Sequence, residues 1–165
     1  RPPRSTRSGA SAASDVYKRQ RWYGPSVAAG RDGRFVVAWA IGPFPYNICA
    51  QPFDADAQPV TPPYIVNTCT EGNQGRPCVT SDGSDRFLIL WDCHDPSGDG
   101  CCVRSQLCTG AGGLVDCESA LHVEGARRNW YPGAAMAPDG RYVVVWIAEP
   151  PDGQGYDVFA QTGAM

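Results

Sequence analysis

Apolar residues gather in short unbroken runs along this chain, and polar turn residues separate the runs. Three of these runs, at residues 35–39, 87–91 and 142–146, end in tryptophan. No segment shows the i, i+3, i+4 spacing of an amphipathic helix, and clusters of Pro, Gly and Asp bound each run. The pattern predicts an all-β protein.

The runs recur at a fixed distance from a proline. Pro25, Pro77 and Pro132 each precede the tryptophan of their run by 14 residues, which gives repeat lengths of 52 and 55 residues. The extra three residues fall between the tryptophan and a later repeated glutamine, where a loop tolerates a change of length. We therefore divide the chain into three units, at residues 21–73, 74–128 and 129–165, the third being partial.

Each unit is predicted to contain four short strands. The first follows the proline, the second is the apolar run, the third ends at the repeated glutamine, and the fourth lies near 64–67 or 120–123. The second strand has no polar alternation, so both of its faces must be covered. Stacked blades of a β-propeller provide such cover, whereas a β-sandwich needs about 100 residues. The sequence predicts about three four-stranded antiparallel blades, an incomplete arc of a larger propeller.

Residues 1–20 resemble a translated sequencing adaptor, although a disordered basic tail has a similar composition. Without the five basic and one acidic residues of this segment, 9 basic and 16 acidic residues remain, a net charge of −7. An acidic body with no basic cluster argues against a nucleic-acid partner. No apolar run is long enough to span a membrane.

The chain has eight cysteines, an even number that favours disulfides and an extracellular or cell-surface location. The intervals do not fix the pairing, but Cys69–Cys78 is expected to clasp the crossover between the first two units and Cys108–Cys117 the turn between the third and fourth strands. The other disulfide candidates are Cys93, Cys101 and Cys102, with no fixed pairing. A zinc site fits less well, because the adjacent Cys101 and Cys102 do not give the C-x₂₋₄-C spacing of structural zinc ligands.

The units also contain a recurring set of motifs: "DG" at 32–33, "FVVAW" at 35–39, "AQPFD" at 50–54 and "VNT" at 66–68. In these motifs residues 21–165 resemble the propeller-like, VCBS-type repeats of large secreted or surface proteins of bacteria. The resemblance implies a scaffold or adhesion module. Its implied partners are neighbouring blades of the same longer chain, and carbohydrate or a surface protein. The alternative is a fragment of a secreted propeller-fold glycoside hydrolase, such as a sialidase-like enzyme.

No catalytic motif stands out in the sequence. Neither His94 nor His122 lies in a motif that supplies a nucleophile and an orienting acid. The S-x-D-x-G-x-T-W turn of sialidases is absent, and Ser81-Asp82-Gly83 is interpreted as a plain turn. The sequence therefore predicts a protein that is not an enzyme.

Two groups of residues are candidates for ligand binding. Trp22, Tyr23, Trp130 and Tyr131 precede the first strands of two units and could form a carbohydrate platform, or a contact that joins adjacent blades. No cofactor is expected unless Asp95, Ser97 and Asp99, which offer oxygens, bind calcium, and a hairpin turn uses the same residues.

The repeated tryptophans and glutamines have structural interpretations. Trp39, Trp91 and Trp146 are expected to pack between blades. Gln51, Gln106 and Gln161 are expected to hydrogen-bond to the backbone of a neighbouring strand or blade.

Overall fold

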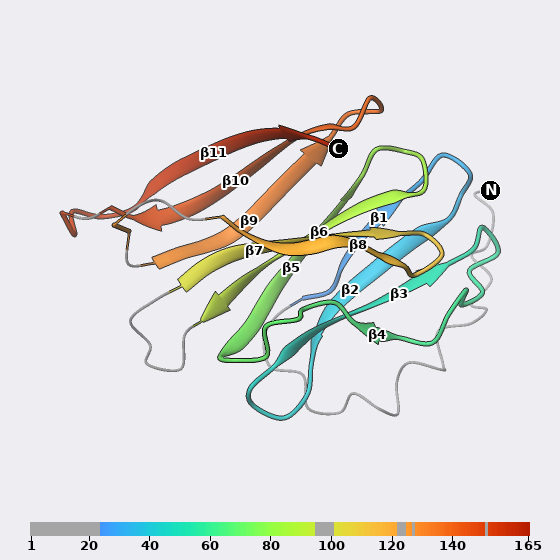
Figure 1. Cartoon of the computed structure of the whole chain (residues 1–165), viewed down its shortest axis with the longest axis horizontal. Coiled ribbons are helices and arrows are strands. Elements are labelled where there is room, and N and C mark those ends of the chain that lie inside the picture. Colours follow the sequence, from blue (N-terminus) through green and yellow to red (C-terminus); the bar gives the residue numbers. More distant parts are fainter. Residues whose placement is uncertain (1–23, 95–100, 122–124, 127, 151) are drawn as a thin grey trace, which may run out of the picture.

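The structure is a computed structural model that describes residues 24–94, 101–121, 125–126, 128–150 and 152–165. These residues form eleven strands and no helix, arranged in three antiparallel sheets. Figure 1 shows the sheets beside one another in chain order, and we call them blades 1, 2 and 3. The predicted all-β class is confirmed. No helix able to cross a membrane occurs among the described residues.

In each blade the strands pair in chain order. Blade 1 contains β1 (Ser26–Ala29), β2 (Phe35–Ile41), β3 (Asn47–Phe53) and β4 (Tyr64–Ile65). Blade 2 contains β5 (Asn73–Ser81), β6 (Arg86–His94), β7 (Cys101–Thr109) and β8 (Leu114–Leu121). Blade 3 contains β9 (Arg128–Met136), β10 (Arg141–Glu149) and β11 (Asp157–Ala164). The first strand of blade 2, β5, contacts both β1 and β9, so the first strands of the three blades lie side by side.

Two hydrophobic cores hold the blades together. The first joins blades 1 and 2 and includes Val36, Ile48, Phe87 and the fully buried Trp91. The second joins blades 2 and 3 and includes Trp146, which is 4% exposed. Because successive strand residues face opposite sides, the apolar run of β6 supplies Phe87, Ile89 and Trp91 to the first core and Leu88 and Leu90 to the second. The predicted packing of these tryptophans between blades is confirmed for Trp91 and Trp146.

The aspartate-glycine turns that precede the apolar runs repeat in structure as well as in sequence. Asp32 and Asp139 each accept a hydrogen bond from the backbone N–H two residues later, at 3.1 Å in both turns. Gly33 and Gly140 follow them with φ of +83°, a value that side chains disfavour. Asp82 makes the same contact with the Ser84 N–H at 2.7 Å, which confirms the interpretation of Ser81-Asp82-Gly83 as a turn.

Two of the repeated glutamines hydrogen-bond to backbone carbonyls in or just before the next strand of their blade. Gln51 donates to the carbonyl of Thr61 at 3.1 Å, and Gln106 donates to the carbonyl of Val115 at 2.8 Å. The predicted backbone hydrogen bonds are confirmed for these two side chains. The third glutamine, Gln161, is exposed.

The first strands of blades 2 and 3 begin earlier than predicted. They start at Asn73 and Arg128 and run through Pro77 and Pro132, where the sequence predicted a boundary. The register shifts at both prolines, so that two residues lie opposite one tryptophan. Proline is tolerated there because a β-bulge leaves one residue without a ladder hydrogen bond. Strand β8 also begins earlier, at Leu114.

All eight cysteines lie in the described part of the chain, and all are free thiols. The disulfides predicted for Cys69–Cys78 and Cys108–Cys117 are not present. Cys78 packs against the second core, and Cys108 is completely buried in the first. Cys117 is exposed, whereas its expected partner Cys108 is buried.

Several predictions concern residues outside the described part. These are the adaptor-like segment 1–20, the aromatic pair Trp22 and Tyr23, the calcium candidates Asp95, Ser97 and Asp99, and His122. Among the residues that are described, no group of three or more His, Cys, Asp or Glu side chains could hold a metal ion.

Candidate functional site

The most concentrated polar chemistry lies at the edge of blades 2 and 3 where β5 and β9 begin. Because neighbouring strands are antiparallel, this edge also holds the end of β6 and the start of β7, with Asn73 opposite His94 and His94 opposite Cys101. In blade 3 it holds Arg128 opposite Glu149. We call it the entry edge, and it lies at the lower left of Figure 1.

A completely buried carboxylate anchors the entry edge. Asp92, the third-last residue of β6, has no exposed surface and accepts a hydrogen bond from Arg76 at 2.6 Å. Its other oxygen lies 3.4 Å from Nε2 of His94. A buried charge is tolerated only where partners compensate it, and here two cations do so.

His94 is held in its charged form by these neighbours. The Asp92 carboxylate and a contact of 3.0 Å between the Cys101 sulfur and Nδ1 raise the pKa of His94 to about 9, although burial alone would lower it. With Arg76 and His94 charged and Asp92 ionised, the cluster carries one net positive charge at neutral pH. Both cationic side chains reach solvent, at 28% and 27% exposure.

The two β-bulges direct Arg76 and Tyr131 toward each other. These residues occupy equivalent positions, directly before Pro77 and Pro132, and both have positive φ, at 47° and 52°. The Arg76 guanidinium lies 4.4 Å from the centre of the Tyr131 ring. Left-handed backbone in bulky residues costs free energy and gathers at functional sites, where it fixes the direction of a side chain.

Aromatic rings extend the site across blade 3. Tyr131 is 55% exposed and Tyr156 is 57% exposed, and Trp130 lies between them with ring centres 6.4 and 5.6 Å away. Arg128 lies over Trp130 at 5.4 Å. The structure thus brings together two of the four residues of the predicted carbohydrate platform, Trp130 and Tyr131.

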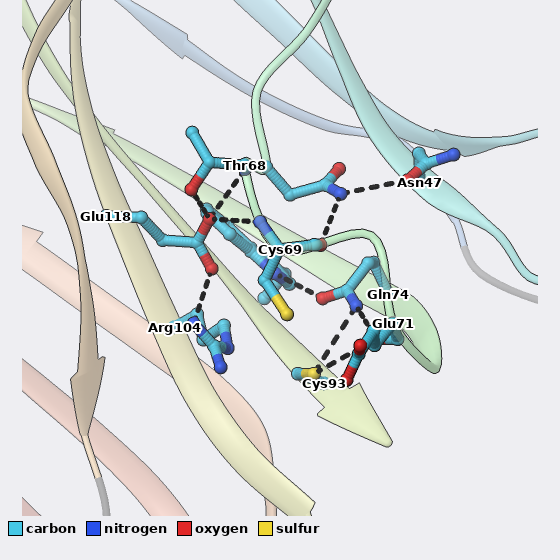
Figure 2. Close-up of polar contacts among 10 residues, drawn as sticks. Asn47, Thr68, Cys69, Glu71, Gln74, Cys93, Arg104 and Glu118 are labelled. Carbon is cyan, nitrogen blue, oxygen red and sulfur yellow. Dashed lines mark hydrogen bonds and ion pairs between the residues drawn. The ribbon is translucent and has the colours of Figure 1, made fainter. Parts of the chain in front are cut away.

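A second polar network, at the seam between blades 1 and 2, is structural in character. Glu118 accepts hydrogen bonds from the Thr68 hydroxyl and N–H, from the Cys69 N–H, and from Arg104 at 2.8 Å (Figure 2). Burial raises the pKa of Glu118, but these hydrogen bonds, from Thr68 first, outweigh burial and hold it below its usual value. The carboxylate has little access to solvent, so it joins the blades and does not face a ligand.

Sequence reasoning missed Arg76, Asp92 and His94. A signal was present, because Asp92 directly follows the buried run "RFLILW" and a charge in such a strand needs a partner. Arg76 also occupies the position that Tyr131 occupies in the next unit. His94 was set aside because it lies in no catalytic motif, and the structure places it as the last residue of β6.

Searches with the sequence alone give no relatives. No protein-family model matches the chain, and no curated protein matches it. The resemblance to VCBS-type repeats therefore stays a prediction.

The fold, in contrast, matches the propeller fold of glycoside hydrolases. A Hadza microbial sialidase aligns with 84% of this chain and 34% of its own, with a TM-score of 0.64 and 9% identity. An arabinanase from Bacillus subtilis aligns with 84% of this chain and 52% of its own (TM-score 0.56, 10% identity). An endo-arabinase from Bacteroides thetaiotaomicron aligns with 93% of this chain and 60% of its own (TM-score 0.56, 12% identity). The predicted propeller-like architecture is confirmed.

These matches correct one prediction. The sequence predicted a protein that is not an enzyme, yet the solved structures named above are all glycoside hydrolases, so the chain has an enzyme fold. The sequence prediction was wrong because it relied on local motifs, whereas the similarity to these enzymes lies in the fold. The chain spans about one third to three fifths of the length of these structures.

Proposed function

We propose that this chain is part of a propeller-fold glycoside hydrolase and that its entry edge binds an acidic carbohydrate. The observation that carries the proposal is the juxtaposition of Arg76, His94 and the exposed Tyr131 ring at that edge. The glycoside hydrolase fold supports the enzyme class. The scaffold or adhesion role has no comparable support from the structure.

The cluster suits a sugar that carries a carboxylate. Arg76 and His94 form the positively charged part of a chain whose overall charge is negative, and charge-assisted hydrogen bonds to carboxylates are among the stronger polar contacts. The Tyr131 ring next to them presents a flat apolar face to the sugar ring. Asp92 is buried and acts as a positioning residue, because it holds both cations and cannot touch a ligand.

Most glycoside hydrolases use two carboxyl groups on either side of the scissile bond, and sialidases use a tyrosine in place of the nucleophilic carboxylate. At the entry edge, Glu71 is exposed just before β5, and Glu149 ends β10 with 21% of its side chain exposed. We propose these two as the groups of this chain that transfer protons. The sequence-based expectation of an extracellular or cell-surface location fits a polymeric substrate and belongs to the same proposal.

Binding is tested by calorimetry with three probes: sialyllactose, lactose and arabino-oligosaccharide. We expect sialyllactose to bind most tightly and Tyr131→Gly to weaken it at least tenfold. Glycine relieves the positive φ while removing the ring, so stability should change by less than about 1 kcal/mol. Phe44→Ala, an exposed aromatic of the β2–β3 hairpin in blade 1, is the matched control. Equal losses in both variants, or a preference for the neutral probes, would overturn the acidic-sugar proposal.

Turnover is tested with fluorogenic glycosides of the same sugars. Loss of a general acid or base typically costs about 10²–10⁴-fold in rate. We therefore expect Glu71→Gln and Glu149→Gln to lower turnover by at least about 100-fold while the affinity for sialyllactose stays near that of the wild type. Unchanged turnover in both variants would exclude them as proton-transfer groups.

A further inference from the structure

Two cysteines face each other directly across the two central strands of blade 2, next to the entry edge. Cys93, on β6, is the register partner of Cys102, on β7, and their thiols hydrogen-bond to one another. Directly opposed residues in an antiparallel pair have Cα atoms about 4.5–5.5 Å apart. A disulfide requires about 4.4–6.8 Å. The backbone therefore already has the spacing of a cross-strand disulfide.

The surroundings of the pair favour a thiolate. The Gln74 amide donates to the Cys93 sulfur at 3.3 Å, and its orientation is fixed because its oxygen accepts from Trp91 at 2.8 Å (Figure 2). Arg104, two residues beyond Cys102 on the same face of β7, adds a positive charge.

The hydrogen bond from Cys102, together with Gln74 and Arg104, lowers the pKa of Cys93 to about 6. The hydrogen bond to Cys93, then burial and the negative charge on Cys93, raise the pKa of Cys102. Where burial dominates, the pKa of a thiol rises instead, to about 12 for Cys49 and to about 11 for Cys108. The dithiol therefore differs from the buried Cys49 and from Cys108 of the first core.

We propose that Cys93 and Cys102 form a reversible disulfide that joins β6 to β7 beside the entry edge. The oxidant is a small-molecule disulfide such as oxidised glutathione. Cys93 is buried whereas Cys102 is only partly buried, so the attacking thiolate forms on Cys102 when the proton that the pair shares passes to Cys93. Cys102 then forms a mixed disulfide and releases one small thiolate.

In the second step Cys93 loses its proton and attacks the Cys102 sulfur, which releases the second small thiolate. Two protein thiols and one small disulfide thus give one protein disulfide and two small thiols. No other co-reactant is needed.

The adjacent Cys101 is not part of this pair. Successive residues of a strand face opposite sides, and the Cys101 sulfur lies 3.0 Å from His94. Asp92 and His94 flank Cys93 in β6, so the disulfide would fix the strand end that carries the candidate site. The inference stands whether or not the entry edge binds carbohydrate, because it concerns only the sulfur chemistry of the pair.

The test uses the full chain, reduced and then exposed under native conditions to increasing ratios of oxidised to reduced glutathione. Peptide mapping by mass spectrometry should find Cys93 linked to Cys102, with the loss of two hydrogen atoms, at a lower ratio than any other cysteine pair. Dithiothreitol should reverse the change. The rate of oxidation should reach half of its plateau near pH 6.

Variants separate this pair from its neighbours. Cys93→Ser and Cys102→Ser should abolish the linkage, and Cys108→Ser, which removes a buried thiol of the first core, should leave it unchanged. If a serine variant fails to fold, the peptide map of the oxidised wild-type protein still tests the proposal. A linkage through Cys101, or free thiols at Cys93 and Cys102 when the exposed Cys117 is already oxidised, would overturn the proposal.

Discussion

At the scale of single residues, the buried Asp92 decides the charge of its neighbours. It is fully enclosed yet contacts Arg76 and His94, both of which reach solvent. A carboxylate in this position makes the entry edge positive without itself meeting a ligand. Asp92 therefore holds the side chains of Arg76 and His94 in place.

We predict that His94 titrates well above an ordinary histidine. Its NMR titration midpoint should lie near 9 and should move toward 6.5 in Asp92→Asn, because the neutral amide no longer favours the imidazolium. Since the folded pKa is raised, the stability that charged His94 contributes is complete below pH 6.5 and is lost as the pH rises through 9.

The control for this titration is Asp139→Asn, a substitution in a turn of blade 3 that should leave the midpoint unchanged. The signal of His122 is assigned by His122→Asn. A His94 midpoint near 6.5 in the wild-type protein would contradict the charge assigned to the cluster.

Glu118 supports a second prediction, which concerns acid stability. Its pKa is lowered, so the stability it contributes is present above its ordinary value of 4.5 and is lost as the pH falls through the folded value. Glu118→Gln should lower the free energy of unfolding by about 2–3 kcal/mol at pH 7, because charge-assisted hydrogen bonds are lost. The difference should shrink as the pH falls below 4.5 and through the folded pKa of Glu118. Urea unfolding at several pH values measures it, and a constant difference would contradict the ionic origin.

At the scale of the strand, the repeated tryptophans are anchored by amides that belong to the neighbouring first strand. Trp91 donates to Gln74 at 2.8 Å, and Trp146 donates to Asn129 at 3.0 Å. Asn129 also donates to the carbonyl of Cys101 at 2.9 Å, which links blade 3 to blade 2. The tryptophan N–H thus meets a glutamine in blade 2 and the shorter asparagine in blade 3.

We predict that Asn129→Leu destabilises the protein by about 1–3 kcal/mol, because it leaves the Trp146 N–H and the Cys101 carbonyl buried without this partner. Asn129→Gln is the matched control, since Gln74 plays the equivalent part in blade 2, and it should retain most of the stability. Chemical unfolding of both variants provides the measurement. Equal losses in the two would show that side-chain volume, and not the hydrogen bond, matters at this position.

The apolar runs and turn residues predicted the strands well, because burial on both faces of a central strand leaves an unbroken run in the sequence. The bulges could not be predicted in this way. Pro77 and Pro132 suggested strand boundaries, and only the pairing of β5 with β6 and of β9 with β10 shows that the strands continue through them. The candidate site could not be predicted from the sequence either, because Arg76 and Tyr131 come into contact only where blades 2 and 3 pack together.

At the scale of the whole molecule, blade 3 has an apolar outer face among the described residues. Val145 and Val158 point away from the second core and are 39% and 74% exposed. In addition, β11 pairs only with β10 and lies at the edge of its sheet. Such a face and such an edge favour association with another sheet.

We predict that residues 21–165, produced alone, are oligomeric at micromolar concentration. Val145→Lys combined with Val158→Lys should shift the population toward monomer, as measured by analytical ultracentrifugation, because charges oppose burial of that face. Restoring neighbouring blades should have the same effect. A wild-type monomer with one sharp, cooperative unfolding transition would contradict the prediction and indicate a self-contained β domain.

The orientation of the tryptophans has a consequence for the symmetry of such an oligomer. Trp91 and Trp146 both face the blade that precedes them in the chain, so each interface joins two different surfaces. Contacts of this kind are heterologous, and repeating them gives a closed ring or an open helical filament, whereas a two-fold dimer requires one surface to meet its own copy. Copies of this chain that associate through their blade faces should therefore add head to tail, and their average size should rise with concentration until a ring closes.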